Sequence, residues 1–229
     1  SLSALPITLN YRPVSHNDGQ ATYFREMLRQ VMNARPPKRR NFYTEWDYEQ
    51  AVKEYENNPI YGWCHKNTKA DGTPYNIYKD GLKIYTTINS TMQQYAEEAM
   101  LKQLRTVIQP KMDAQYRSTK VLFQNTSAEE REKIVRQAMR YSDRYRALKE
   151  EGRSEAEIDR IFRTPCPTRV FTYRGERDTI LSPRDSILHH KRIMRAGFVA
   201  IEPQTGRVKA YVGGPNFRYF KYDMAKQGK

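Results

Sequence analysis

The sequence predicts an α+β fold that contains short strands, a β-hairpin and a mostly helical insert. The hairpin is the first observation. Residues 198–212 form two strand-like runs around a turn in which Pro203 fixes φ and Gly206 takes the left-handed conformation. The second observation is a β-branched run at 82–88 followed by apolar residues at helical spacing over 92–108. Because strand and helix patterns both occur in one chain, we predict the α+β class.

The first part of the chain predicts short elements joined by loops. Residues 5–9 alternate like a short strand, and residues 22–32 carry their apolar side chains on one helical face. Residues 35–40 hold two prolines and four cations, which stop a helix and predict a linker or an exposed basic loop. A second helix is expected over 45–55, before the breaker at 57–59.

The strand at 82–88 and the following helix are expected to meet at Asn89 and Ser90. Lys83 is the only charge in the run, which has the composition of a well-packed strand. Asn89 and Ser90 both offer caps, and Gln93 stands three residues after Ser90, the spacing of a capping box. We expect the helix to end or kink at Pro110, which lacks an N–H.

Residues 111–163 predict a mostly helical insert. Ser127 and Ser154 each precede a glutamate by three residues, which predicts two capped helices, and Gly152 supplies a stop between them. The segment is dense in charge and poor in large apolar groups. We therefore expect it to be the least stable part of the chain.

A strand is expected again after the insert. Residues 169–173 are rich in β-branched and aromatic side chains, and Gly175 predicts a turn. A helix is then expected over 185–194, before the hairpin. We find no internal repeat.

The charge of the chain favours an anionic partner or surface. Forty Lys and Arg against 26 Asp and Glu give a net charge of +14 and a pI near 9.7. Nucleic acid, membrane headgroups and phosphorylated substrates all fit. The run at 35–40 with Phe42 and Tyr43 resembles a nucleic-acid patch in composition only, since no zinc finger or RNP motif accompanies it. No apolar run reaches the roughly 18 residues that span a bilayer, so we expect a soluble chain, cut from a longer protein whose termini could hold an anchor.

The cysteines and histidines predict no metal site. Cys64 and Cys166 are too far apart for a metal knuckle; they either pair in an oxidising compartment or remain small unpaired hydrophobes. No ligand at metal spacing accompanies Cys64 and His65. His189 and His190 point about 100° apart on a helix and are expected at the surface.

No residue of the chain is predicted to be catalytic or to bind a cofactor. The adjacent glutamates at 97–98 and 129–130 are expected on solvated helix faces, because an acid/base pair needs convergence in a desolvated cleft. The glycines at 213–214 follow a strand without the spacing of a P-loop, so we interpret them as a strand exit.

Several motifs of the chain together match the pattern of one protein family. They are Asp80 to Asn89, Met92-Gln93-Gln94, Phe171 to Tyr173, Gly175, Asp178-Thr179, Ser182-Pro183, Asp185-Ser186-Ile187, Ala196 to Pro203, Thr205 to Gly214, and near the start Ala4-Leu5-Pro6, Tyr23 to Glu26 and Arg29. With these motifs the chain resembles class A (bifunctional) penicillin-binding proteins of the 1A type. The likeness is strong over 78–101 and 165–229, moderate over 1–33, and weak over 34–77 and 102–164. The stretch 165–229 resembles the sequence just before that family's transpeptidase active site.

Such proteins polymerise lipid II with a membrane-anchored glycosyltransferase and cross-link stem peptides with a serine transpeptidase. The transpeptidase uses Ser-x-x-Lys, Ser-x-Asn and Lys-Thr-Gly elements. Ser-x-x-Lys and Lys-Thr-Gly are absent here, and the Ser-x-Asn letters at 15–17 lie far upstream of the transpeptidase region. In the family the nucleophile follows the motifs at 216–217 and 223–225 closely. The resemblance therefore implies that the nucleophile lies just past Lys229 and that the glycosyltransferase glutamates lie before Ser1.

The resemblance also implies an organisation for the chain. Residues 1–77 would be the glycosyltransferase exit and interdomain linker, 78–110 the start of the transpeptidase region, 111–164 a helical insert, and 165–229 the transpeptidase region up to the nucleophile. The chain would hold neither catalytic centre and would set the distance and orientation of two active sites, at the periplasmic face of the bacterial inner membrane. Its partners would be the remainder of the parent chain, peptidoglycan and cell-wall regulators.

Two other classes stay open. A basic anion-binding module for nucleic acid or acidic lipid fits the charge and the run at 35–40. A complete small enzyme of unknown type is opposed by the lack of any nucleophile, metal or phosphate motif.

Overall fold

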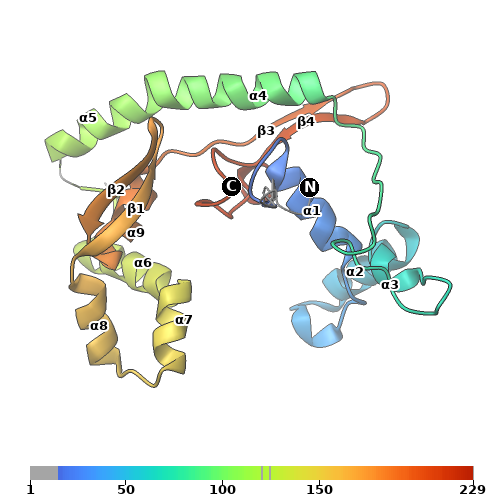
Figure 1. Cartoon of the computed structure of the whole chain (residues 1–229), viewed down its shortest axis with the longest axis horizontal. Helices are drawn as coiled ribbons and strands as arrows, with labels where there is room; N and C mark the ends of the chain where they lie inside the picture. The colour runs from blue at the N-terminus through green and yellow to red at the C-terminus, as the bar shows by residue number, and fades with distance from the viewer. Residues whose placement is uncertain (1–14, 120, 124, 229) are drawn as a thin grey trace, which may run out of the picture. The chain divides into compact units, whose positions relative to one another are not determined.

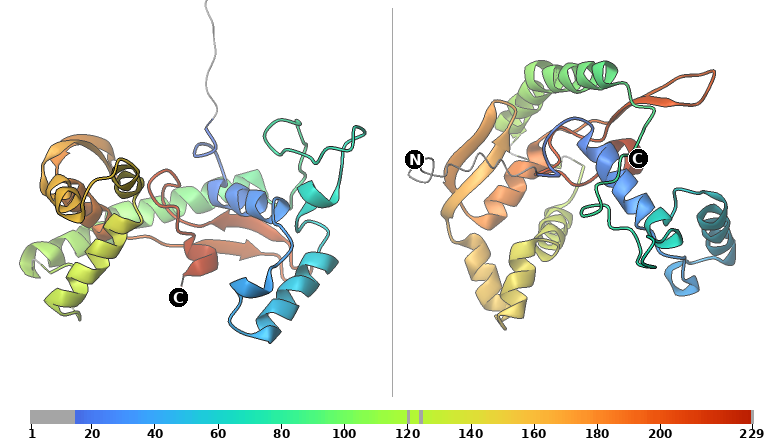
Figure 2. Two further views of the ribbon diagram at one scale, coloured as in Figure 1. Left: turned by 90° about the horizontal axis from the view of Figure 1, so that it is seen from below. Right: turned by 45° about the vertical axis from the view of Figure 1, so that its right-hand side comes forward.

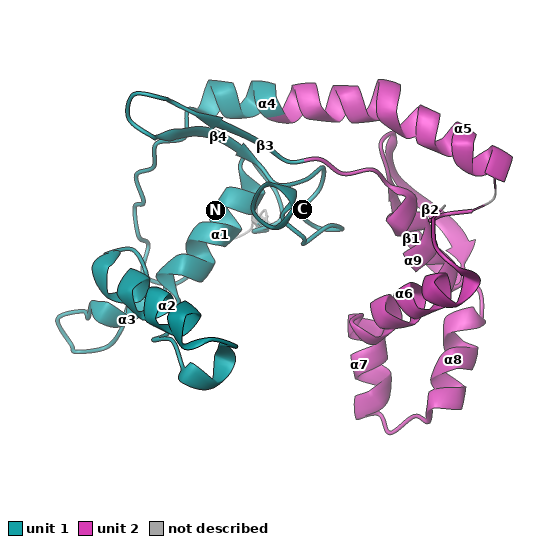
Figure 3. Ribbon diagram, turned by 180° about the vertical axis from the view of Figure 1, so that it is seen from behind, with its two compact units in different colours: residues 1–96, 197–229 teal, residues 97–196 magenta. Residues whose placement is uncertain are grey.

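The computed structural model describes residues 15–119, 121–123 and 125–228, and the chain divides into two compact units (Figures 1 and 3). Unit 1 contains residues 1–96 and 197–229, and unit 2 contains residues 97–196. The strand expected at 5–9 lies outside the described residues, as does the Ala4-Leu5-Pro6 motif. The unit boundaries at 96/97 and 196/197 differ from the segment boundaries expected at 110/111 and 164/165.

The described elements of unit 1 are mostly short helices and one hairpin. They are α1 (Thr22–Met32), η2 (Arg39–Asn41), α2 (Glu45–Asn57), α3 (Trp63–Lys66), the start of α4 (Ser90–Gln103), β3 (Phe198–Ile201), β4 (Val208–Val212) and α10 (Met224–Gln227). Those of unit 2 are the π-helix η3 (Leu104–Ile108), α5 (Gln109–Thr119), α6 (Ala128–Arg140), α7 (Asp143–Glu150), α8 (Glu155–Arg163), β1 (Cys166–Thr172), β2 (Gly175–Leu181) and α9 (Pro183–Arg192).

The α+β class and the hairpin are confirmed. β3 and β4 pair antiparallel from Phe198 opposite Val212 to Ile201 opposite Val208, with a register shift next to Ile201. Gly206 in the turn has φ +69°, the left-handed value expected for it. The helices expected over 22–32 and 45–55 are also confirmed, as α1 and α2.

The strand expected at 82–88 is wrong. These residues form no ladder, and most of their side chains are exposed. Only the end of the run contacts β4: Thr87 Oγ1 donates to the Val208 carbonyl at 2.7 Å, and the N–H of Asn89 donates to the Lys209 carbonyl at 2.9 Å. Composition gives β propensity, but a strand also needs a partner edge that matches it along its length.

The helix after this run starts where it was expected, but with a different cap. Asn89 accepts a hydrogen bond from the N–H of Met92 at 3.0 Å, so Asn89 is the N-cap and the Ser90–Gln93 capping box is wrong. The helix also continues past Pro110. The five π-helical residues of η3 end at Ile108, two residues before Pro110, and this wider turn accommodates a residue that lacks an N–H.

Unit 2 has its own hydrophobic core. The capping boxes at Ser127 and Ser154 are confirmed, although a further N-cap at Ser142 divides the first expected helix into α6 and α7. α9 packs against α6, α8 and the β1–β2 hairpin (Figure 2). β2 was not predicted, because its residues are mostly polar and exposed. The core residues are Val135, Met139, Ile158 and Phe162, with Tyr145, Leu148, Ile187 and Leu188 packed against them.

Two polar contacts fix α9 in unit 2. Arg184 on α9 forms a 2.5 Å ion pair with Glu132 on α6. Burial raises the pKa of Glu132, but hydrogen bonds from Arg184 and Arg136 outweigh it and leave this pKa below its usual value. Gln109 at the start of α5 accepts from the N–H of Met194 at 2.8 Å and so holds the end of α9.

Candidate functional site

Helix α1 packs on the chain segment that follows β4. Tyr23 of α1 is only 4% exposed, and its hydroxyl donates to the Phe220 carbonyl at 2.6 Å. Its ring meets the Phe217 ring edge to face at 5.0 Å. Lys221 reaches back to the Asn17 side-chain oxygen at 2.5 Å. Residues near the start and near the end of the chain are thus held together within unit 1.

The glycine pair at the end of β4 makes room for Tyr23. A Cβ on Gly213 would lie 2.6 Å from Tyr23 Cδ1 and 2.5 Å from Asp223 Oδ1. A Cβ on Gly214 would overlap the Tyr23 hydroxyl and lie 2.9 Å from Cζ. The interpretation of these glycines as a strand exit is confirmed, and their function is the close approach of α1.

Asp223 links β4 to α10. One carboxylate oxygen accepts from the Tyr211 hydroxyl at 2.7 Å, and the other accepts from the N–H groups of Ala225 at 2.9 Å and Lys226 at 3.2 Å. Asp223 is therefore the N-cap of α10. Burial, together with this carboxylate, raises the pKa of Tyr211 and keeps its hydroxyl a donor.

Gln93 of α4 completes this arrangement at the other edge of β4. Its side chain is fully buried, and it both donates to and accepts from the backbone of Tyr211. We call the resulting cluster the α1–β4 junction. It consists of Tyr23, Gln93, Tyr211, Gly213, Gly214, Phe217, Phe220 and Asp223.

The chemistry of the junction is positional. Its buried polar groups hydrogen-bond to one another and to backbone, and these bonds hold α1, α4, β4 and α10 against one another. Among the residues that the structure describes, no three His, Cys, Asp or Glu gather where they could hold a metal ion. Within the same residues, no helix has the length and apolarity to cross a membrane.

The placement of His189 and His190 at the surface is wrong. Both are half-buried on α9 and bond to the backbone of Phe171 in β1. His189 Nε2 lies 2.8 Å from the Phe171 carbonyl, and the Phe171 N–H donates to His190 Nε2 at 3.3 Å. Burial lowers the pKa of His190, and the neighbouring His189 adds to this effect. The pair joins α9 to β1.

Cys64 and Cys166 are free thiols. Cys64 is buried, and burial raises the pKa of its thiol. A hydrogen bond with Thr168 lowers the pKa of the half-buried Cys166, and Arg144 contributes in the same direction. Cys64 belongs to unit 1 and Cys166 to unit 2, so each thiol is described within its own unit.

The basic run at 35–40 lies in an exposed loop with η2. Arg39 bonds to the Glu45 carboxylate and donates to the Phe42 carbonyl at 2.8 Å. Tyr43 beside it is fully exposed. The loop is therefore tied to the start of α2 through one of its four cations.

A comparison with protein families finds one match, to the penicillin-binding protein middle domain, over residues 118–194. The match supports a member of the penicillin-binding protein family. No curated protein and no solved structure matches the chain.

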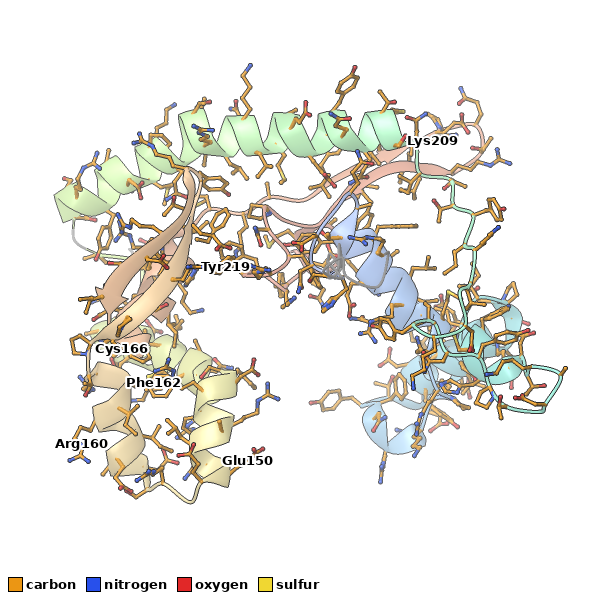
Figure 4. All side chains as sticks on the ribbon, in the orientation of Figure 1. Glu150, Arg160, Phe162, Cys166, Lys209 and Tyr219 are labelled. Carbon is orange, nitrogen blue, oxygen red and sulfur yellow. The ribbon has the colours of Figure 1, made fainter. Side chains whose placement is uncertain are left out.

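The penicillin-binding protein middle domain match lies within unit 2. It includes α6, α7, α8, both strands of the β1–β2 hairpin and α9, and therefore spans the boundary expected at 164/165. Most of it lies in the segment 102–164, where the resemblance to class A proteins is weakest. The core around Phe162 shows why these elements form one unit (Figure 4).

Sequence reasoning placed most residues of the α1–β4 junction in motifs of the resemblance but did not bring them together. Tyr23 belongs to the stretch Tyr23 to Glu26, and its partner Phe220 lies 197 positions later in the chain. Gln93 was interpreted as a cap. The sequence carries no signal for its burial, because its helical neighbours Asn89, Ser90 and Glu97 are also polar.

Proposed function

We propose that this chain is the non-catalytic linker and N-terminal transpeptidase part of a peptidoglycan synthase. The parent protein would polymerise lipid II and cross-link stem peptides, as class A penicillin-binding proteins of the 1A type do. The match over 118–194 supports the penicillin-binding protein part of this proposal. The motifs over 171–214 support the class A part.

The observation that carries the proposed role is the hydrogen bond from Tyr23 to Phe220. α1 resembles the exit from the glycosyltransferase domain, and residues 213–225 resemble the approach to the transpeptidase nucleophile. The hydrogen bond, the ring contact with Phe217 and the glycine pair hold these two segments in one place. The α1–β4 junction would thereby fix the orientation in which the chain enters the transpeptidase active site.

The remaining parts of the proposal concern the surroundings of the parent protein. It would be anchored in the inner membrane outside this chain, with the chain on the periplasmic side. Its partners would be the rest of the parent chain, peptidoglycan and cell-wall regulators. A nucleic-acid module would instead bind one duplex sequence tightly; we expect weak, sequence-blind binding, because the charge lacks a base-reading element.

Covalent labelling by a fluorescent penicillin tests the proposal. We expect the 229-residue chain to remain unlabelled and the full-length parent to be labelled at one serine, because acylation needs a Ser-x-x-Lys pair. In the parent, Tyr23→Ala should slow labelling, since it removes the contacts of α1 with residues 217 and 220. Tyr95→Ala is the control, because Tyr95 on α4 is 64% exposed.

The two parts of the proposal fail in different ways. Stoichiometric labelling of the 229-residue chain alone would show that the active site is misplaced. A folded full-length parent without labelling would overturn the family assignment. Equal labelling rates for the Tyr23→Ala and Tyr95→Ala parents would leave the family in place and reject the positioning role.

A further inference from the structure

Unit 2 contains a cavity of about 760 Å³ whose walls are rich in arginine. This volume is in the range of small-molecule sites. The cavity lies between η3 and α5 on one side and the β1–β2 hairpin and the end of α9 on the other. Its charged lining residues are Arg105, Asp113, Arg117, Arg174, Glu176, Arg177 and Arg192.

Four of these arginines are uncommitted. Arg105, Arg117, Arg174 and Arg177 are exposed, and among the described residues their guanidinium groups have no ion-pair or hydrogen-bond partner. They come from η3, α5, the β1–β2 turn and β2, so that no single helix face explains their gathering.

The fifth arginine has a fixed position in the same wall. The Arg192 guanidinium lies 3.8 Å from the centroid of the Tyr116 ring and 3.6 Å from Asp113 Oδ1. Its Nε is buried and has no hydrogen-bond partner among the described residues. A stacked guanidinium loses little freedom on binding and can present its remaining donors to a ligand.

The two acids of the lining are already engaged. Asp113 accepts from the Gln109 side chain at 3.0 Å in addition to its contact with Arg192. Glu176 lies 3.8 Å from Arg169, which is outside the cavity. The described lining of the cavity therefore offers no further carboxylate that could neutralise the positive charge of the four uncommitted arginines.

We propose that this cavity is a binding site for a multiply charged phosphate group such as diphosphate. Guanidinium forks match carboxylate and phosphate oxygens in geometry. A single carboxylate would balance only one of the four uncommitted charges, whereas a diphosphate balances several. The site is independent of the proposed function, because no part of the α1–β4 junction belongs to it.

Calorimetric titration of the 229-residue chain with inorganic diphosphate at low salt tests the site. A second arm uses vesicles of phosphatidylglycerol, with phosphatidylcholine vesicles as the neutral reference. The test variant is Arg174→Gln/Arg177→Gln. The control is Arg140→Gln/Arg160→Gln, which removes the same charge from two exposed arginines of α6 and α8 outside the cavity. Circular dichroism checks that both variants fold.

We expect the test variant to weaken binding about tenfold or more, and the control variant to bind like the original chain. Variant-sensitive binding of diphosphate, with or without binding of vesicles, supports the site. Variant-sensitive binding of phosphatidylglycerol vesicles alone, whose headgroup phosphate carries one negative charge, would overturn the assignment to a multiply charged ligand. Equal weakening by the two variants, or no binding in either arm, would overturn it.

Discussion

The side chain of Gln93 forms a pair of hydrogen bonds with the backbone of Tyr211. Its Nε2 donates to the Tyr211 carbonyl at 2.9 Å, and its Oε1 accepts from the Tyr211 N–H at 2.7 Å. A side-chain amide carries the same donor and acceptor as a peptide group. Gln93 therefore occupies the edge of β4 as a paired residue of another strand would, and this explains how a fully buried glutamine is satisfied.

Replacing Gln93 with leucine should destabilise unit 1. Both backbone groups of Tyr211 would stay buried without partners, at a cost of about 1–3 kcal/mol for each group. The measurement is urea unfolding followed by tryptophan fluorescence, because Trp46 and Trp63 both lie in unit 1. Gln103→Leu on the exposed end of α4 is the matched control and should change the free energy of unfolding by less than about 0.5 kcal/mol. Similar losses in the two variants would contradict the pairing.

The contact between Gly214 and Tyr23 predicts a clash that a second change relieves. Gly214→Ala should destabilise unit 1 by about 1–3 kcal/mol, because its Cβ would overlap the Tyr23 hydroxyl. Tyr23→Phe removes that hydroxyl together with its hydrogen bond to Phe220. The loss in free energy of unfolding of the double variant should therefore be smaller than the sum of the two single-variant losses by at least about 0.5 kcal/mol. Strictly additive losses would mean that the two residues do not touch.

The helix caps and the hairpin turn were predictable because their partners are local. Ser127 and Ser154 each bond to a residue three positions later, and Gly206 needs only its own φ. Spacing in the sequence contains all of that information.

The strand at 82–88 and the cap at Ser90 were not predictable in the same way, since each depends on a distant partner. Among the described residues, the run at 82–88 has no neighbouring strand that pairs with it along its length. The side chain of Gln93 hydrogen-bonds to Tyr211, 118 positions away, and does not cap its own helix. The two histidines follow the same rule, because their partner Phe171 belongs to another element. Where a polar side chain has both a local and a distant hydrogen-bond partner available, tertiary packing determines which partner it takes.

Phe162 should carry much of the stability of unit 2. It is 1% exposed and belongs to the core between α6 and α8. Phe162→Ala should cost about 3–5 kcal/mol, through lost burial and the cavity that remains. Hydrogen exchange of the α6 and α8 amides measures this loss, and Ile180→Ala on β2, where the side chain is 71% exposed, is the control.

The same measurement on the unchanged chain tests the expectation that residues 111–163 open first. That expectation requires the α6 and α8 amides to exchange faster than the amides of 198–212.

The stability of unit 2 should decrease in mild acid because of His190. Burial lowers the pKa of this imidazole from its usual value near 6.5, so the folded chain favours the neutral ring. The Phe171 N–H donates to Nε2 at 3.3 Å, and a protonated Nε2 could not accept that bond. The stabilisation is therefore complete above pH 6.5 and is lost as the pH falls through the depressed pKa of the folded state.

Exchange rates of the β1 and α9 amides, measured at pH values on both sides of 6.5 and corrected for intrinsic exchange, give the opening free energy that should show this loss. Glutamine at position 190 keeps a hydrogen-bond acceptor but does not titrate, so His190→Gln should flatten the dependence on pH. His65→Gln is the control, because His65 is exposed on α3 in unit 1. A pH dependence that persists unchanged in His190→Gln would assign the effect to another group.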